Sequence, residues 1–259
     1  MLKRWGEMTS AEIAGLADPV VSILPVAATE QHGPHLPTGT DALILQAILE
    51  RALRRGGPLR AVSLPLQAIG WSIEHGDFPG TLSLPAELLA GAWTELGGAV
   101  AKLGLKRLLI LNSHGGNPPA IAIAALRLRA EHGLFVAQTH WEALARPAEI
   151  APAGATERDW HAGWIETSVM LHLRPELVAM DKAHPAARPA EGLPPPDGPA
   201  PWAWMTSDLG TNGVIGDPRH ATAELGRQLL QRAVDGLAEV LAQMAAAPWP
   251  PSSGGFGAK

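Results

Sequence analysis

The sequence predicts an α/β domain in which a mainly parallel sheet is covered by helices on both faces. Short apolar runs rich in β-branched residues alternate with longer stretches of helical spacing, and this alternation is typical of parallel strands joined by helical crossovers. The length of 259 residues and the hydrophobic content of 46% are enough for one full core. We therefore expect a single domain over residues 1–250 and a short flexible tail over 251–259.

The expected elements follow one another in a regular order. A first helix starts at a Thr9 or Ser10 cap and is stopped by Pro19. Strands are predicted at 20–26, 60–66, 106–111 and 134–138. Further helices are predicted at 42–55, 85–103, 118–131, 159–171 and about 220–246, and Pro118 and Gly133 mark the two ends of the helix at 118–131. The core face of the helix at 42–55 is expected to hold Leu45, Ile48, Leu49 and Leu53.

Three loops are rich in glycine or proline. Residues 70–80 form a long loop with polar and aromatic side chains, and such loops commonly carry function. Residues 185–202 hold much of the chain's proline and are expected to form a surface excursion rather than a linker between domains. Trp202 and Trp204, at its end, are expected to pack against a subunit interface. Residues 210–218 form the third loop, before the terminal helix.

The composition excludes several kinds of site and partner. Cys is absent, so metal ligands must be oxygen or nitrogen atoms and no cysteine nucleophile exists. Tyr is also absent, which leaves acid–base chemistry to His, Asp or Glu. A net charge of −5 does not suggest a nucleic-acid surface. We see no secretory signal and no apolar run of about eighteen residues, so a cytoplasmic protein without nucleic-acid or membrane partners is expected.

Metal-binding residue types gather where predicted strands end. Glu30, His32 and Asp41 lie within twelve residues just after the strand at 20–26, and His114 follows the strand at 106–111. His161 and Glu166 stand at the start of a later helix, and are therefore available to the same site. Because parallel strands end at one edge of a sheet, imidazoles and carboxylates can reach a divalent ion there from different directions. The sequence predicts a metal site at this edge.

The turn at residues 112–117 has a competing interpretation as a glycine-rich phosphate cradle. That interpretation is weak, because the Walker lysine and the dinucleotide glycine spacing are both absent. Asn112 and Asn117 are expected to brace the turn. Among the other histidines, His35 is expected to be structural, and His140 fits either a pocket wall or the core.

Four motifs resemble, in order, those of the creatininase (creatinine amidohydrolase) family. They are Glu30-Gln31-His32-Gly33-Pro34-His35-Leu36-Pro37 with Asp41, then Phe78-Pro79-Gly80-Thr81-Leu82-Ser83-Leu84, then Asn112-Ser113-His114-Gly115-Gly116-Asn117, then His161-Ala162-Gly163 with Glu166-Thr167-Ser168. The resemblance implies a three-layer α/β/α sandwich and hydrolysis of a C–N bond in a small amide. It also implies two divalent ions per chain, Zn²⁺ or Mn²⁺ with Fe²⁺ as an alternative, and assembly as a homohexamer.

The resemblance assigns roles by position. Glu30 and His114 would bind one ion, His32 would bind the other, and Asp41 would bridge them. His161 would transfer the proton to the leaving nitrogen. A bridging carboxylate suits two ions about 3.5–4 Å apart.

One position departs from the family pattern. Creatininase itself carries a Glu two positions after the His of the third motif, where it completes the second metal's ligands, and this chain has Gly116 there. Glu166 is the expected replacement, and the alternative is a carboxylate that only orients His161. The expected substrate contacts are Trp164, His75, Gly115 and Gly116.

The function predicted from these observations is a binuclear metal-dependent hydrolase of the amide bond in a small molecule, cyclic amides such as creatinine included. The alternatives within the family are a formamide deformylase and a peptidase that trims a modified peptide. From another class, a metal-stabilised binding protein without catalysis would also account for the ligand pattern.

Overall fold

Five parallel strands form the sheet at the centre of the molecule. The computed structural model describes residues 2–55, 61–155, 158–186 and 193–251. The strands are β1 (Leu2–Arg4), β2 (Val21–Val26), β3 (Ala61–Ser63), β4 (Arg107–Asn112) and β5 (Phe135–His140). Their order across the sheet is β1-β3-β2-β4-β5, and every neighbouring pair is parallel. The predicted α/β class with a parallel sheet is confirmed.

The central strands β2 and β4 are buried along their whole length. They pair in register from Val21 with Arg107 to Val26 with Asn112. Successive side chains of a strand face opposite sides of the sheet, so Ile23 joins the core on one face while Leu24 joins the core on the other. This explains why the strand at 20–26 is continuously apolar rather than alternating.

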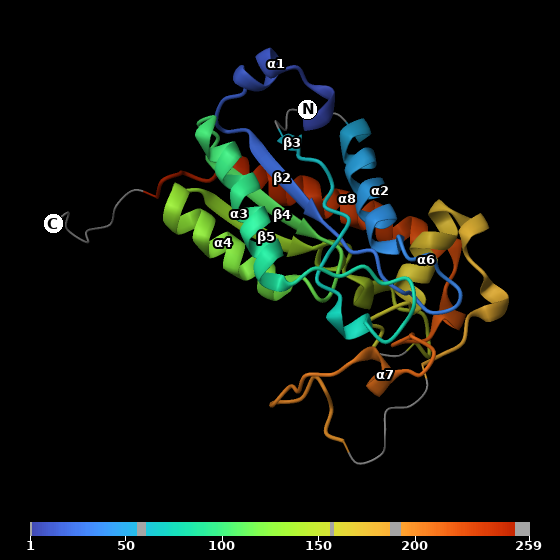
Figure 1. The fold of residues 1–259 in the computed structure, drawn as a ribbon. Coiled ribbons are helices and arrows are strands. Elements are labelled where there is room, and N and C mark those ends of the chain that lie inside the picture. The colour runs from blue at the N-terminus through green and yellow to red at the C-terminus, as the bar shows by residue number, and fades with distance from the viewer. Residues whose placement is uncertain (1, 56–60, 156–157, 187–192, 252–259) are drawn as a thin grey trace.

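Helices cover both faces, as Figure 1 shows. One face carries α3 (Ala86–Lys102) and α4 (Pro118–His132). The other carries α2 (Thr40–Arg55), α5 (Trp141–Ala145), α6 (Trp164–Leu173) and α8 (Ala223–Ala246), with α8 crossing behind the strands. The three-layer α/β/α arrangement implied by the resemblance is therefore present in a single domain.

Shorter elements complete the fold. They are α1 (Ser10–Ala14), α7 (Thr206–Leu209) and 3₁₀ turns at Trp5–Glu7, Ile73–His75, Pro147–Ile150, Pro175–Leu177, Met180–Lys182 and Pro218–His220. The first helix has the predicted cap: Glu12 N–H donates to Thr9 Oγ1, and the Thr9 N–H donates to the Glu12 carboxylate.

Two elements differ from the sequence prediction, and two predicted segments lie partly outside the described residues. Strand β1 was not predicted, because it has only three residues, two of them basic, and lies at the sheet edge. The helix predicted from 159 begins at Trp164, because the Asp159 carboxylate accepts hydrogen bonds from the N–H groups of the first helical turn. Part of the 185–202 excursion, at 187–192, and residues 252–259 of the predicted tail lie outside the described residues.

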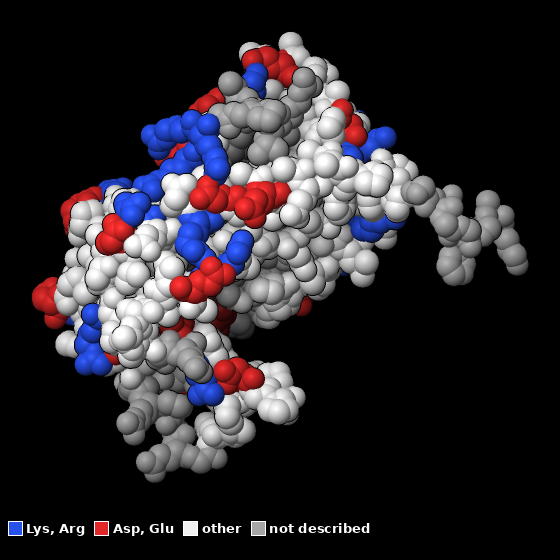
Figure 2. Space-filling view, turned by 180° about the vertical axis from the view of Figure 1, so that it is seen from behind, with Lys and Arg blue, Asp and Glu red and all other residues white. Residues whose placement is uncertain are grey.

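The surface shows no large field of one charge on the face seen in Figure 2, where basic and acidic side chains are interspersed. Oppositely charged side chains also pair across elements, as Arg55 does with Asp235 and Arg232 with Glu149. Of the helices that the structure describes, none combines the length and the apolar character needed to cross a membrane.

Candidate metal centre

The candidate ligands converge at the carboxyl ends of β2 and β4. Glu30 and His32 lie on the loop after β2, Asp41 stands in the first turn of α2, and His114 follows β4. Glu166 comes from the first turn of α6. At most 7% of the surface of any of these five residues is exposed. The structure therefore brings together residues that are 136 positions apart, from Glu30 to Glu166.

Two groups of potential ligands share Asp41. In one, Glu30, Asp41 and His114 offer atoms that all lie within 4.8 Å of one another, and in the other His32, Asp41 and Glu166 do the same. His114 Nδ1 is 3.1 Å from Glu30 Oε1 and 3.5 Å from Asp41 Oδ2. His32 Nε2 is 3.4 Å from Asp41 Oδ1 and 3.6 Å from Glu166 Oε1. The two oxygens of Asp41 thus face different groups.

Four atoms in these groups are buried without a hydrogen-bond partner among the described residues: Glu30 Oε1, Glu30 Oε2, His32 Nε2 and Asp41 Oδ2. Buried polar atoms are nearly always satisfied, because an unmade hydrogen bond costs about 1–3 kcal/mol. Divalent ions would satisfy all of these atoms at once. The residues therefore fit the ions that the resemblance implies.

Hydrogen bonds on the far side of each imidazole fix its orientation. His32 Nδ1 lies 3.1 Å from the Glu30 carbonyl oxygen, to which it donates, so Nε2 faces Asp41 and Glu166. His114 Nε2 donates to the Trp71 carbonyl oxygen at 2.9 Å, so Nδ1 faces Glu30 and Asp41. Metal-binding imidazoles commonly have such a backbone partner on the other ring nitrogen.

Backbone contacts hold Glu166 in the same way. Its Oε2 accepts the Ala162 N–H at 2.7 Å, which leaves Oε1 directed toward His32. Asp159 fixes the start of α6 by accepting from Trp164 N–H and Ile165 N–H at 3.0 and 2.9 Å. A Cβ at position 163 would overlap the Asp159 carboxylate, so glycine is required there.

The buried carboxylates and imidazoles shift one another's pKa values. Burial raises the pKa of Asp41 to about 7, and the charge of Glu30 adds to the rise. Burial would also raise the pKa of Glu166, but the charge and the hydrogen bond of His32 lower it to about 2. Burial would lower the pKa of His114, yet Glu30 and Asp41 raise it to about 10. Carboxylates gathered in a buried site thus need positive charge beside them, which imidazolium groups or divalent ions can supply.

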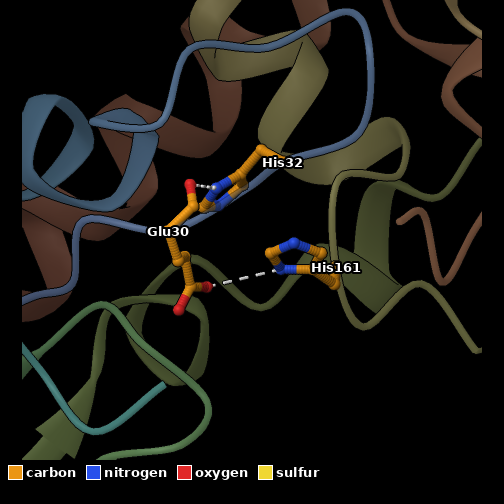
Figure 3. Close-up of side chains that lie close together, drawn as sticks. All are labelled: Glu30, His32 and His161. Atoms are coloured by element: carbon orange, nitrogen blue, oxygen red, sulfur yellow. Dashed lines mark hydrogen bonds and ion pairs between the residues drawn. The ribbon is translucent and has the colours of Figure 1, made fainter. Parts of the chain in front are cut away.

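His161 lies beside this centre, just before the start of α6. It pairs through its backbone with Ile215 of the 210–218 loop. Its Nε2 donates to the Gln31 carbonyl oxygen at 2.7 Å, so the unprotonated Nδ1 points toward the Glu30 carboxylate, 3.6 Å away (Figure 3). Figure 3 also shows His32 next to this pair. The orientation leaves one basic nitrogen of His161 available at the centre.

Gln31 is a functional candidate that the sequence analysis missed. Its Oε1 accepts the Gly33 N–H and its Nε2 donates to the Gly213 carbonyl oxygen, each at 2.9 Å, which fixes the amide orientation. The second amide hydrogen points to His75 Nδ1 at 2.8 Å. Neutral His75 therefore carries its proton on Nε2, 3.4 Å from Glu30 Oε1. A glutamine between two candidate ligands gave no sequence signal of its own.

Glu74 occupies the space that opens at Gly116. A Cβ at position 116 would overlap the Trp71 carbonyl oxygen, the Glu74 carboxylate and the His114 ring. Glu74 Oε1 lies 3.5 Å from His114 Nε2. A second carboxylate therefore stands near the departure from the family pattern, in addition to Glu166.

A cavity of about 770 Å³ opens onto the centre. Its floor includes Glu30, Asp41, His114, His161 and Glu166, and His75, Gly115 and Gly116 also line it. Trp164 does not line it, because this side chain is packed in the core at 2% exposure. Aromatic residues that the sequence analysis did not place at the site line the wall instead: Trp71, Trp160, Trp202 and Trp204.

The turn after β4 is braced as predicted. Asn112 Oδ1 accepts from the His114 N–H at 3.1 Å and from Asn117 Nδ2 at 3.1 Å. Asn112 Nδ2 donates to the His114 carbonyl oxygen at 2.7 Å. His35 is structural in the sense expected, since its Nε2 contacts Thr167 Oγ1 at 2.9 Å and so joins the ligand loop to α6.

Sequence comparisons place these residues in a known family context. The family model described as creatinine amidohydrolase, named Creatininase, matches residues 6–241. A mycofactocin precursor peptide peptidase from Mycobacterium ulcerans (strain Agy99) is 36% identical over 97% of this chain and 94% of that protein. A creatinine amidohydrolase from Pseudomonas putida is 31% identical over 91% of this chain and 95% of that protein.

Solved structures agree with the sequence comparisons. A manganese creatininase superposes with a TM-score of 0.78 at 26% identity, covering 94% of this chain and 99% of the other. A variant creatininase of Zn–Zn type superposes with a TM-score of 0.77 at 26% identity, covering 94% and 98%. The fold of this chain is therefore similar to that of a manganese creatininase and of a Zn–Zn creatininase variant.

Proposed function

The chain belongs to the creatininase family of hydrolases, and on that premise we propose that it is a binuclear metal-dependent hydrolase of an amide bond in a modified or short peptide. The size of the cavity supports a peptide as the substrate. A volume of about 770 Å³ falls within the range of sites for drug-sized ligands, and a single-ring amide would leave most of it empty. The relative named as a mycofactocin precursor peptide peptidase supports the same choice.

The proposed ion sites follow the two groups of ligands. Glu30 and His114 would hold one ion, His32 and Glu166 the other, and Asp41 would bridge them, with Zn²⁺ or Mn²⁺ as the ions. Ions held there would polarise the scissile carbonyl and lower the pKa of water, so that a nucleophile exists at neutral pH. The orphaned buried atoms of Glu30, His32 and Asp41 support this assignment.

The chain's own residues would perform the remaining steps. His161 presents an unprotonated Nδ1 to the centre, where it would take up a proton and return it to the leaving nitrogen. His75 would donate its Nε2–H to Glu30 and so keep that carboxylate in position. Gly115 and Gly116 line the cavity, and their backbone N–H groups are candidates to bind the developing oxyanion.

A small amide remains the second candidate. The Pseudomonas putida relative named as a creatinine amidohydrolase favours it, and His161, His75 and the ligand set suit either substrate. The four tryptophans and the volume of the cavity favour the peptide, which reverses the order that the sequence alone suggested.

Assembly as a homohexamer is part of the proposal. Leu82, Leu84 and Leu88 are between 38% and 56% exposed on one segment leading into α3, and an apolar surface of this kind is typical of a subunit interface. Light scattering after size-exclusion chromatography tests the number of subunits.

A substrate panel tests the proposed reaction. The protein loaded with Zn²⁺ or Mn²⁺ is incubated with short and modified peptides, formamides, and lactams including creatinine. The products measured are released amine, formate and the ring-opened acid, which is creatine for creatinine. Amine from a peptide is the expected result. Turnover of creatinine or a formamide alone would select another family activity, and metal binding without turnover of any amide would favour the non-catalytic binding protein.

A further inference from the structure

Three polar residues lie together in the cavity outside both groups of candidate ligands. Ser113 follows β4, His140 ends β5 and Glu142 stands in the first turn of α5. The strand register pairs Asn112 with His140, which brings Ser113 beside the His140 ring. All three residues line the cavity, and we refer to them as the Ser113–Glu142 cluster.

Ser113 has a hydroxyl without a partner. The residue is 2% exposed, and its Oγ is buried without a hydrogen bond to any described residue. A buried hydroxyl can usually rotate to find an acceptor, so an orphaned one is uncommon. Ser113 lines the cavity, and rotation of its side chain about χ1 would turn the hydroxyl toward a ligand there, which can supply the missing partner.

The Glu142 carboxylate also has no partner of opposite charge among the described residues. The Glu142 backbone N–H donates to His140 Nδ1 at 3.3 Å, whereas the charges that act on the side chain are those of Glu166, Asp159 and Asp41. Burial and these three carboxylates raise the pKa of Glu142 well above its ordinary value. Burial is the largest of these causes, and a cation placed beside Glu142 would offset it.

Apart from the histidines of the candidate centre, the described lining of the cavity offers Glu142 no cationic side chain. None of the described residues that line it is Lys or Arg. Under the proposed function, Glu30, Asp41 and Glu166 are matched by the metal ions, but Glu142 is not. The aromatic wall is suited to the apolar part of a ligand, since Trp160 and Trp204 are stacked with ring centroids 6.2 Å apart.

We propose that the Ser113–Glu142 cluster is a binding subsite for a protonated amine carried by the substrate. The ammonium group donates one hydrogen bond to the Glu142 carboxylate and a second to Ser113 Oγ, while its apolar body lies against the tryptophan wall. The inference rests on the proposed function, because it names the substrate class of that same cavity. A subsite of this kind would favour amides that carry an amine over substrates that carry a free carboxylate.

Isothermal titration of the metal-loaded protein at pH 7 tests the subsite with three probes of similar shape: benzylamine, benzyl alcohol and benzoate. Benzylamine is protonated at this pH, and we expect it to bind about tenfold more tightly than benzyl alcohol, as a charge-assisted hydrogen bond predicts. Benzoate reports binding at the metal ions instead, because carboxylates are oxygen ligands of Zn²⁺ and Mn²⁺. Equal affinity for benzylamine and benzyl alcohol would overturn the proposal.

Variants distinguish binding at this subsite from amine binding elsewhere on the protein. Glu142→Gln should remove the preference for benzylamine while the metal content stays at the wild-type value, since Glu142 is not a candidate ligand. Ser113→Ala should weaken benzylamine binding about threefold without lowering the thermal stability, because the hydroxyl has no partner to lose. Glu131→Gln, at an exposed position of α4, is the matched control and should change neither benzylamine binding nor metal content.

Two outcomes keep this test distinct from that of the proposed function. If Glu142→Gln binds benzylamine as tightly as the wild type, the amine binds elsewhere, for example at the metal ions, and the subsite is refuted even when peptides are hydrolysed. If the amine preference depends on Glu142 but no amide is hydrolysed, the subsite stands and the proposed reaction fails.

Discussion

The two walls of the cavity are built in opposite ways. The wall formed by Glu30, Asp41 and His114 is almost completely buried and contains polar atoms without partners among the described residues. The wall formed by Trp202 and Trp204 is half-buried, and its polar atoms are satisfied locally, as Trp202 Nε1 is by donating to the Pro194 carbonyl oxygen at 2.9 Å.

The two walls therefore differ in what they contribute to the free energy of folding. Unpartnered buried carboxylates destabilise the fold unless a ligand or a positive charge satisfies them, so the ligand wall is suited to binding a cation. The tryptophan wall is stable by itself and exposes apolar surface to the cavity. We infer that the ligand wall determines the reaction and that the tryptophan wall, with the Ser113–Glu142 cluster, determines the substrate.

The largest effect is expected from Asp41→Ala, which removes the carboxylate shared by both ligand groups. Both ions should be lost together, and kcat/KM should fall by more than about 10³-fold, since several kcal/mol of charge stabilisation depend on them. Metal analysis per chain and steady-state kinetics measure this. Asp235→Ala, on the surface of α8, is the control. One ion per chain that survives Asp41→Ala would refute the bridged centre.

The ligand wall was predictable because much of it is local in sequence. Glu30, His32 and Asp41 follow one apolar strand, and the rules for strand ends bring His114 to the same edge. Glu166 was placed by resemblance, and the structure brings it within 3.6 Å of His32. The α/β class followed from the alternation of strands and helices for the same local reasons.

The tryptophan wall was not predictable, because its members meet only in the folded chain. Trp160 and Trp204 are 44 residues apart on segments without periodicity, and they were expected at an interface or left unassigned. Trp164 was expected at the cavity, but the helix starts at this residue and turns it into the core. Gln31 acts only through contacts with His75 and Gly213, which no short-range pattern encodes.

The second-largest effect on activity is expected from Gln31→Met, which tests how the residues of the ligand wall are held in position. The metal content should remain, because Gln31 is not a candidate ligand, whereas kcat should fall about 10- to 100-fold as His75 loses its fixed proton position. Nitrogen-15 correlation spectra of the imidazoles read the tautomers directly. Gln46→Met, on the surface of α2, is the matched control. Unchanged tautomers with reduced kcat would contradict this role.

Trp204→Ala tests the other wall. We expect KM for a peptide substrate to rise about three- to tenfold with little change in kcat, because a stacked aromatic pair contributes about 0.5–1.5 kcal/mol. The effect on a small lactam should be weaker. Trp249→Ala breaks a comparable stack on Phe135, at the opposite end of β5 from the cavity, and should leave KM unchanged. A fall in kcat alone would assign Trp204 to the reaction instead.

The effect that is smallest near neutral pH, and grows as the pH falls, concerns the stability of the fold and depends on His140 in the cavity lining. Burial is the main cause that lowers the pKa of His140 to about 4, whereas an unfolded imidazole titrates near 6.5. Between these values the unfolded chain binds a proton that the folded chain does not, so stability is lost as the pH falls from about 6.5 to 4, by at most about 1.4 kcal/mol per pH unit.

The free energy of unfolding is measured in urea at several pH values. Its slope against pH reports how many more protons the unfolded chain binds, and His140→Gln should lower that number by up to one. The pKa values of His35 and His75 are lowered to about 4 as well, so part of the slope should remain. A slope that His140→Gln leaves intact would show that this imidazole is solvated in the cavity rather than buried at its wall.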